Sequence, residues 1–469
     1  MPIDFDPYAE LGVASNASVE DIKAAYRRAA RRLHPDVNRL SAGAAAQFQD
    51  ITAAHELLTD DSKRREYDAQ VKRESAEERL GFNFRVTTSK RTVTLLGETQ
   101  VIYMLAEIFP DARANEHKSK NEARLNLTLV LDRSNSMQGI RLEKVKVAAH
   151  QIIDQMREDD VLSIVSFNDR AEVVIEATTI HERSTLKARV SMMSAFGGTE
   201  IGQGLKLGLE QNRKYLAPRL VNHIIMLTDG HTYGDQEFTL NLARDAAADG
   251  ISISAMGLGQ EWNDKFMDSI ASATGGSTSY INSAGGVVRF LNDRVRGLAN
   301  TFAERVTLSI APDPDIKLES AFRLTPDPQP LEVDSHIIPL GGIQYNRSII
   351  TLLQFELPDD LKLGFRTIAR LSVTGDIFPN DFRQFKSIND MSLEVTDVQI
   401  EDDPPQTILD ALGKLTLYRM QEQAQDALER GDVVEATRRL ENLATRLFEL
   451  GHGDLGQQAQ AEAQQVAFT

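Results

Sequence analysis

Cysteine is absent from all 469 residues, and this absence removes several kinds of chemistry. Such a chain has no disulfide bonds, no thiol nucleophile and no thiolate ligands for zinc, and it suits a reducing compartment. A signal-peptide pattern at the N-terminus and an apolar run long enough to span a bilayer are also missing. We therefore expect a cytoplasmic protein without membrane insertion.

Positive charge is in deficit, because 52 Lys and Arg stand against 69 Asp and Glu and give a formal net charge of −17. Binding to nucleic acid needs a basic surface that neutralises phosphates, so nucleic acid is not expected as a general partner. Two common hydrolase motifs, G-x-S-x-G and H-E-x-x-H, are missing as well. Gly202, Gly204 and Gly208 miss the dinucleotide-binding spacing by one residue and fall inside an expected helix.

The N-terminal region contains a strongly amphipathic helix. Ser18 followed by Asp21 predicts a capping box at its start, and Pro35 predicts its end. Apolar residues at three- and four-residue spacing form one stripe: Val19, Ile22, Tyr26, Ala29 and Leu33. The other side is basic, with Lys23, Arg27, Arg28, Arg31 and Arg32.

A second amphipathic helix is expected over Ala44–Leu58, so the two helices form an antiparallel hairpin with His34-Pro35-Asp36 exposed at one end. Together with Asp6-Pro7-Tyr8 and the charged segment Asp60–Asp68, this tripeptide resembles the J-domain of the DnaJ family. The resemblance implies docking on a DnaK-type chaperone through His34, Pro35, Asp36, Lys23, Arg27, Arg28 and Arg31. We expect a J-domain over 1–72 and a helical linker over 73–81.

The remainder of the chain, whose hydrophobic share of the whole is 41%, predicts further packed domains. Short strands alternate with amphipathic helices over 123–303, which indicates a doubly wound, Rossmann-like α/β domain with a mainly parallel sheet. Strand patterns over 82–122 and 304–400 predict one β-sandwich into which the α/β domain is inserted. The region 401–469 predicts an α-helical hairpin, and its Gln/Ala-rich tail is either a third helix or frayed.

Oxygen-bearing side chains follow two of the expected strands and precede one expected helix. Asp132, Ser134 and Ser136 come directly after the strand Leu125–Leu131, Thr199 precedes a helix, and Asp229 ends a second strand. The carboxyl ends of parallel strands meet at one edge of a sheet, where ligands commonly bind. Two carboxylates and three hydroxyls are hard donors that suit Mg²⁺ or Mn²⁺ better than zinc or copper.

The order Asp132-x-Ser134-x-Ser136, then Gly197-Gly198-Thr199, then Thr228-Asp229-Gly230 resembles the metal-ion-dependent adhesion site of von Willebrand factor A (vWA) domains. The resemblance implies that Asp132, Ser134, Ser136, Thr199 and Asp229 hold Mg²⁺, Mn²⁺ or Ca²⁺ directly or through water. It also implies an open coordination position that accepts an acidic residue from a protein partner.

Together these patterns predict a co-chaperone rather than an enzyme. The J-domain would recruit and stimulate a DnaK-type ATPase, and the vWA domain would select the protein to which the ATPase is brought. One alternative is an interaction scaffold in which the J-domain is only a docking arm. A metal-dependent hydrolase using Asp132 and Asp229 ranks last, because no general base, nucleophile or lysine for phosphate binding accompanies the two carboxylates.

Overall fold

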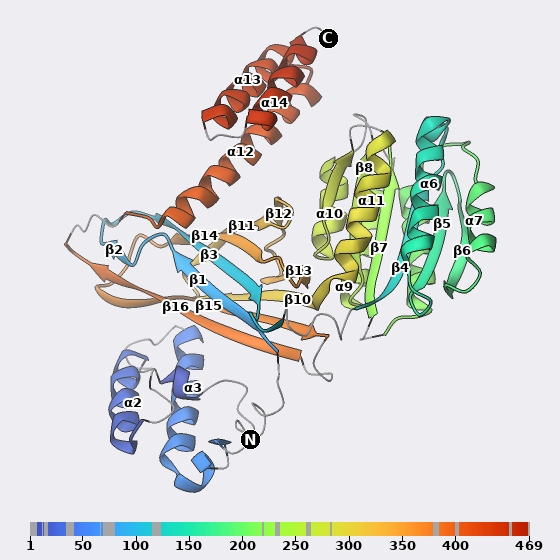
Figure 1. Ribbon diagram of the computed structural model, residues 1–469. Helices are drawn as coiled ribbons and strands as arrows, with labels where there is room; N and C mark the ends of the chain where they lie inside the picture. Colours follow the sequence, from blue (N-terminus) through green and yellow to red (C-terminus); the bar gives the residue numbers. More distant parts are fainter. Residues whose placement is uncertain are drawn as a thin grey trace.

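The computed structural model describes most of the chain in four bodies: an N-terminal helical region, a β-sandwich, an α/β unit and a C-terminal helical bundle (Figure 1). No helix within the described residues is long and apolar enough to cross a membrane. His34-Pro35-Asp36, residues 73–79 of the expected linker and Gly230 lie outside the described residues. The described ranges are 7–11, 13, 17–33, 42–65, 67–68, 80–114, 123–217, 220–229, 235–258, 264–281, 284–378, 384–398, 403–449 and 453–467.

The N-terminal region contains α1 (Pro7–Glu10), α2 (Val19–Leu33) and α3 (Ala42–Thr59), so both predicted helices are confirmed. The predicted capping box is present at the start of α2. The backbone N–H of Asp21 donates to Ser18 Oγ at 3.1 Å, and Ser18 donates its own N–H and hydroxyl to Asp21 Oδ2. The predicted apolar stripe faces a small core formed by Tyr8, Leu11, Ile22, Ala25, Ile51, Ala54 and Leu58.

The opening and closing segments of this region are joined through Tyr8. Its hydroxyl donates to Asp68 Oδ1 at 2.8 Å and accepts from Arg64 Nε at 2.9 Å. Its ring lies 6.3 Å from the ring of Tyr67, and burial is the main cause that raises the pKa of Tyr8. Tyr8 therefore holds the two ends of the helical region together through hydrogen bonds of its hydroxyl and a contact of its ring.

The α/β unit is a six-stranded sheet in the order β6-β5-β4-β7-β8-β9, parallel except for the antiparallel edge strand β6. Side chains alternate between its faces, so Leu129 and Leu131 pack under one helical layer and Val130 under the other. The strands are β4 (Arg124–Asp132), β5 (Val161–Phe167), β6 (Ala171–Thr179), β7 (Leu220–Thr228), β8 (Ser252–Leu258) and β9 (Thr278–Ile281).

Three helices cover each face of this sheet, as expected for a doubly wound fold. One face carries α6 (Ile140–Gln155), α7 (Arg183–Ser191) and α11 (Ala284–Ala299). The other carries α8 (Ile201–Arg213), α9 (Gln236–Ala248) and α10 (Asp264–Ala273).

The β-sandwich has two five-stranded sheets, in the orders β1-β3-β14-β11-β12 and β13-β10-β15-β16-β2. Strand β3 pairs with β14 along its length, although the whole α/β unit lies between them in the sequence. The predicted insertion of an α/β domain into a sandwich is therefore confirmed. The strands are β1 (Phe82–Thr88), β2 (Thr92–Thr94), β3 (Gln100–Pro110), β10 (Thr301–Pro312), β11 (Lys317–Thr325), β12 (Gln329–Leu331), β13 (Ile337–Gln344), β14 (Ile349–Leu357), β15 (Gly364–Ile377) and β16 (Gln384–Thr396).

The chain passes from the α/β unit to the sandwich between Ala299 and Thr301. Helix α11 ends at Ala299, and Thr301 begins β10. Phe302 and Ala303 continue the apolar pattern of α11, but their side chains are buried in the sandwich core instead. The pairing of Thr301 with Gln344 of β13 decides the change from helix to strand.

The C-terminal region contains α12 (Gln406–Glu429), α13 (Val433–Glu449) and α14 (Gly453–Ala467). The expected hairpin is present, and the tail forms a third helix that packs on α13. The first part of α12 lies on the sandwich, where Ile408 and Ala411 contact Phe322 and Leu352. This helix therefore connects the bundle firmly to the sandwich.

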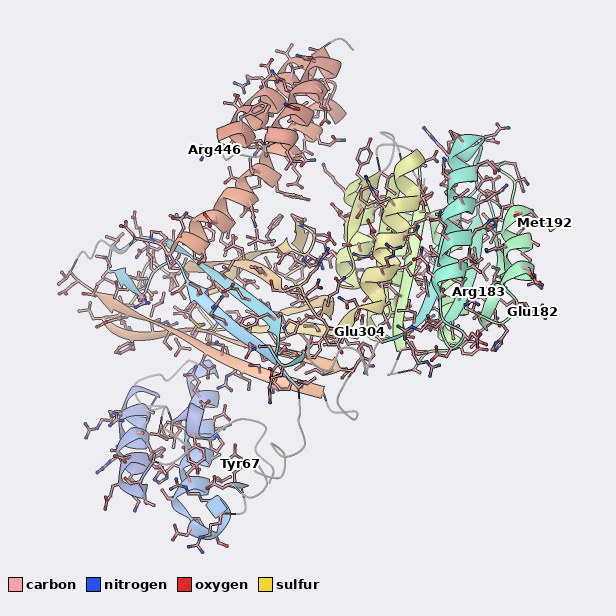
Figure 2. The ribbon with its side chains drawn as sticks, in the orientation of Figure 1. Tyr67, Glu182, Arg183, Met192, Glu304 and Arg446 are labelled. Carbon is pink, nitrogen blue, oxygen red and sulfur yellow. The ribbon has the colours of Figure 1, made fainter. Side chains whose placement is uncertain are left out.

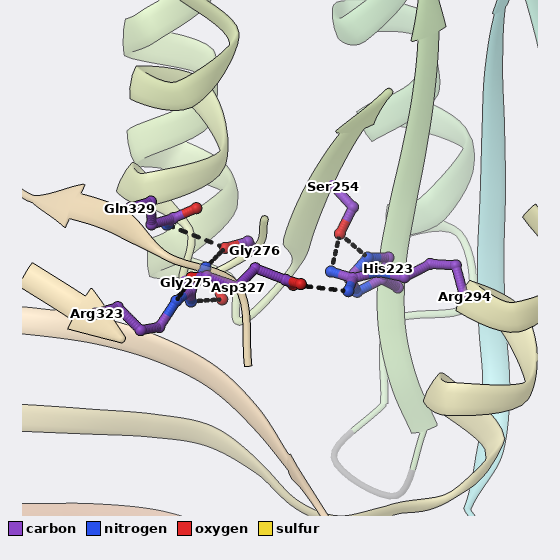
Figure 3. A network of polar contacts seen from close by, with 8 residues as sticks. All are labelled: His223, Ser254, Gly275, Gly276, Arg294, Arg323, Asp327 and Gln329. Atoms are coloured by element: carbon purple, nitrogen blue, oxygen red, sulfur yellow. Dashed lines mark hydrogen bonds and ion pairs between the residues drawn. The ribbon is translucent and has the colours of Figure 1, made fainter. Parts of the chain in front are cut away.

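Arg323 joins the α/β unit to the sandwich (Figure 3). Its side chain on β11 is 1% exposed and donates to the carbonyl oxygens of Gly275 at 3.1 Å and Gly276 at 2.5 Å. Burial lowers the pKa of Arg323 to about 10. Because the backbone carbonyls satisfy this buried cation, the α/β unit has a fixed position on the sandwich.

Candidate functional site

The candidate metal site lies where β4 and β7 end. These strands are parallel neighbours, so Asp132 at the end of β4 and Asp229 just after β7 reach the same edge of the sheet. The hydroxyl of Thr228 donates to Asp132 Oδ2 at 2.6 Å and fixes that carboxylate between the two strands. The edge is the one on which sequence reasoning placed the site.

Four of the five predicted ligands form one continuous chain of hydrogen bonds. Asp132 Oδ1 accepts the backbone N–H of Ser134 at 2.7 Å, which folds the loop back on the strand end. The hydroxyls of Ser134 and Ser136 lie 2.9 Å apart, and Ser136 donates to Asp229 Oδ1 at 2.6 Å. The alternation of the motif thus brings Asp132, Ser134 and Ser136 together on one loop, and Asp229 joins them from the neighbouring strand end.

The fifth predicted ligand, Thr199, lies on a loop bound to the first one. The N–H of Asn135 donates to Gly197 O at 3.0 Å, and the N–H of Phe196 donates to Arg133 O at 2.9 Å. Gly197 has φ +82°, a conformation that favours glycine at this turn. Thr199 is half-buried, and no hydrogen bond between described residues joins it to the other four ligands.

Carboxylates also shape the loop that contains Thr199. Asp169 Oδ1 accepts the N–H of Gly198 at 2.9 Å, and Asp235 Oδ2 accepts the N–H of Gly202 at 2.7 Å. Burial raises the pKa of Glu200, and the charges of Asp235 and Asp169 raise it further. Asp169 and Asp235 thus satisfy one backbone N–H group in the loop and one in the first turn of α8, and so position the loop.

The site has a buried excess of negative charge. Asp132 is fully buried, and its pKa is raised to about 6, mainly by desolvation and slightly by the charge of Asp229. Arg141, in the first turn of α6, donates to Asp229 Oδ2 at 2.5 Å and to the carbonyl of Ser136 at 3.2 Å. Sequence reasoning missed Arg141, although its place in the helix directly after the Asp132 loop was a usable signal.

The donor set fits a hard divalent cation. Each carboxylate oxygen has two lone pairs, so Asp132 and Asp229 keep capacity for a metal beside their present hydrogen bonds. Among the described residues no group of three or more His, Cys, Asp or Glu side chains is placed to hold a metal ion. Two carboxylates with neighbouring hydroxyls are a set that suits Mg²⁺, Mn²⁺ or Ca²⁺.

The predicted chaperone-docking residues that the structure describes lie on α2. Ile22 and Ala25 face the core, whereas the opposite face is solvent-exposed and basic. On the core side, the ring of Tyr26 stacks on His55 of α3 at 4.2 Å. The exposed basic face consists of Lys23, Arg27, Arg28 and Arg31.

Family models match three of the four bodies of the chain. A DnaJ-domain model matches residues 6–68, a vWA-domain model matches 126–293, and a model of the Sll0103-like C-terminal α-helical domain matches 406–469. Protein sll0103 of Synechocystis sp. is 31% identical over 344 residues, which are 71% of this chain and 80% of sll0103. The chain belongs to the sll0103 family.

In this sll0103-family protein a J-domain precedes the vWA region. Chaperone protein DnaJ 2 of Mycolicibacterium paratuberculosis is 50% identical over 66 residues, which are 14% of this chain and only 17% of that protein. The similarity to DnaJ proteins is therefore confined to the J-domain.

Two solved structures share the fold over most of the chain. A vWA protein from Catenulispora acidiphila has a TM-score of 0.67 at 16% identity and covers 81% of this chain and 89% of its own. The ArnB paralog VWA2 from Sulfolobus acidocaldarius has a TM-score of 0.52 at 14% identity and covers 82% and 97%. These matches extend beyond residues 126–293, so the fold they share includes more than the vWA domain.

Proposed function

We propose that this sll0103-family protein is a co-chaperone whose J-domain recruits and stimulates a DnaK-type ATPase, while its vWA domain binds a protein partner through a divalent cation. The observation that supports this proposal best is the presence of two candidate binding sites in one chain, one exposed and basic and one buried and acidic. One is the basic face of α2, and the other is the edge of the vWA sheet with Asp132 and Asp229. The protein itself catalyses no reaction in this proposal, and it acts in the cytoplasm.

The basic face of α2 suits an acidic protein surface. Lys23, Arg27 and Arg31 succeed one another at four-residue spacing, so they form one row along the helix. Exposed charges of this kind steer association and set its salt dependence more than they add affinity. In the proposal α2 docks on the chaperone and His34-Pro35-Asp36 triggers hydrolysis.

The first prediction concerns this trigger. His34→Gln and Asp36→Asn should abolish stimulation of a DnaK-type ATPase in single-turnover assays without changing the melting temperature. Arg85→Gln, at an exposed arginine paired with Glu107 on the sandwich, is the matched control and should keep full stimulation. Equal ATPase rates for wild type and both J-domain variants would favour the scaffold alternative, in which the J-domain is only a docking arm.

At the vWA edge, Asp132, Ser134, Ser136, Thr199 and Asp229 would hold the cation directly or through water. The bound ion would supply an open coordination position for a carboxylate of the partner. The buried negative charge of Asp132 and Asp229, which among the described residues is paired with the single cation Arg141, supports a cation there.

The second prediction tests the cation. A ligand that binds only the native state stabilises it by about 2.7 kcal/mol at 100 times its Kd, so saturating Mg²⁺ should raise the melting temperature of the wild type by several degrees. Asp132→Ala should lose this rise. Asp159→Ala, which removes an exposed carboxylate paired with Arg124, is the control and should keep it. An unchanged rise in Asp132→Ala would place the cation elsewhere.

A further inference from the structure

A three-residue ion-pair cluster joins the J-domain to the sandwich. Arg370 of β15 donates from Nη1 to Asp50 Oδ2 of α3 at 2.7 Å. The same guanidinium donates from Nε and Nη2 to the two carboxylate oxygens of Asp390 on β16, at 2.7 and 2.8 Å. Asp50 and Arg370 are 320 residues apart in the sequence, so only the folded chain brings them together. We name Asp50, Arg370 and Asp390 the latch.

The latch differs from an ordinary surface ion pair. Arg370 alternates along β15 with the buried Ala369 and Leu371, so its side chain lies on the outer face of the sheet. Arg370 lies directly opposite Asp390 in the strand pairing. Their bidentate contact orients the guanidinium for binding to Asp50. The Arg370 side chain is only 18% exposed and that of Asp50 25%. Such a pre-oriented, partly desolvated pair exceeds a typical exposed one in strength.

The latch holds α3 near its middle. Asp50 lies eight residues after the start of α3 at Ala42, a distance of about 12 Å along the helix. The segment 34–41, with His34-Pro35-Asp36 at its beginning, directly precedes α3 in the sequence. Figure 1 shows α3 meeting the sheet that contains β15 and β16. The latch therefore ties the J-domain to the sandwich about midway along α3, eight residues after the helix start at Ala42 and nine before its end at Thr59.

The connection between the two bodies favours this contact. Asp68 ends the described part of the J-domain, and Leu80 is already buried in the sandwich core. Only residues 69–79 connect them, and a short connection of this kind gives an effective concentration in the millimolar range. A contact too weak to hold two separate proteins together is then well populated within one chain.

We propose that the latch restrains the J-domain, so that a DnaK-type chaperone engages it fully only after Asp50 has left Arg370. This inference rests on the proposed co-chaperone function and adds its regulation. The closed form leaves the basic face of α2 exposed for a first encounter but fixes α3 against β15, so the J-domain cannot turn freely to fit the chaperone. The apparent affinity for the chaperone then decreases with the fraction of latched molecules.

The test compares ATPase stimulation by the full-length protein at chaperone concentrations below saturation. Arg370→Gln and Asp50→Asn should each raise stimulation by about 3- to 10-fold, the shift that loss of one partly buried ion pair produces. The double variant should exceed neither single variant, because both changes remove the same contact. Arg85→Gln again serves as the matched control, since it breaks an Arg–Glu pair on the same sandwich away from α3.

The absence of cysteine allows a direct measurement of docking, because two introduced cysteines are the only sites for spin labels. Glu56→Cys on α3 and Lys386→Cys on β16 are at exposed positions. In the otherwise wild-type chain the distance distribution between the labels should be narrow, and Arg370→Gln should broaden it.

The outcomes separate the two proposals. Equal stimulation by wild type, Arg370→Gln and Asp50→Asn overturns the latch and leaves the co-chaperone function in place. A distance distribution that Arg370→Gln leaves narrow overturns the latch as well. Failure of the wild type and of every variant to stimulate a chaperone that responds to another J-domain protein overturns the co-chaperone function, and the latch inference with it.

Discussion

Burial changes the protonation of Glu304. It lies at the start of the sandwich strand β10, next to the α/β unit, and is 6% exposed (Figure 2). Burial raises its pKa to about 7, against the opposing effects of the Arg305 backbone N–H and the charges of Arg305 and Arg294. A neutral Glu304 is therefore favoured in the folded protein below neutral pH.

The third prediction follows from the sign of this shift. The folded state holds a proton on Glu304 between pH 4.5 and about 7, and the unfolded state does not, so the free energy of unfolding should decrease as pH rises through this range. The decrease should be on the order of 2–3 kcal/mol. Glu304→Gln should remove it, as measured by urea denaturation at a series of pH values.

Asp132 also contributes to the pH dependence, because its pKa is raised to about 6. The decrease in the free energy of unfolding that Asp132 causes should persist in Glu304→Gln and be complete near pH 6. Glu176→Gln, at a side chain that is 77% exposed, is the control and should leave the pH dependence of the wild type intact. An identical slope between pH 6 and 7 in the wild type and in Glu304→Gln would contradict the assignment.

At the scale of elements, α8 explains the glycines that resemble an incomplete dinucleotide motif. A Cβ atom added to Gly204 would lie 2.7 Å from Cγ and Cδ1 of Phe167, and one added to Gly208 would lie 2.6 Å from Cγ2 of Val130. Both neighbours are fully buried in the sheet. The glycines therefore allow close approach of α8 to β4 and β5, and this packing role accounts for them.

The fourth prediction compares two glycines inside helices. Gly204→Ala should destabilise the protein by about 1–3 kcal/mol, because the fully buried Phe167 ring cannot move away. Gly413→Ala in α12 should instead stabilise it by about 0.5–1 kcal/mol, since nothing lies within 4 Å of the new methyl group and alanine favours the helix. Chemical denaturation of both variants is the measurement, and equal changes would refute the packing argument.

Strands were harder to predict than helices. The stripe of α2 and the capping box formed by Ser18 and Asp21 are local features, so the sequence was sufficient. Strand β13 contains Pro339 and the pair Gly341-Gly342, which are typical of loops, and it forms because β10 lies alongside. Strand β16 is largely polar because one of its faces is exposed, so its pattern was equally weak.

At the scale of the whole molecule, the two proposed binding surfaces belong to different bodies. The basic face of α2 is in the J-domain, and the site of Asp132 and Asp229 is in the vWA domain, with the sandwich joined to both through Arg370 and Arg323. A rigid connection of the vWA domain to the sandwich, combined with a short connection to the J-domain, keeps the chaperone near the bound partner.

The fifth prediction is that the two activities separate by mutation. Asp132→Ala should lose the protein partner in co-purification and still stimulate the ATPase, whereas Asp36→Asn should keep the partner and lose stimulation. EDTA should release the partner from the wild type. A partner that remains bound in EDTA and to Asp132→Ala would shift the binding surface to the sandwich or the C-terminal helices.

The candidate site was predictable to the extent that its geometry is local. Asp132, Ser134 and Ser136 alternate along one loop at the end of a strand, so their convergence could be inferred from spacing. Asp229 could be added because parallel neighbouring strands end at the same edge. The place of Arg141 in the helix directly after the Asp132 loop indicates that it lies near the site, but its ion pair with Asp229 is seen only in the folded chain.

The sequence by itself determined the elements and motifs whose cause lies within a few residues: the amphipathic helices, the alternating strands, and the tripeptide and loop patterns that identify the J-domain and the vWA domain. The tertiary structure alone decided the pairing of β3 with β14, the burial of Arg323 and Glu304, and the contact of Asp50 with Arg370. Each of these depends on groups far apart in the chain. They come together only when whole bodies pack against one another, and a pattern of neighbouring residues does not predict such packing.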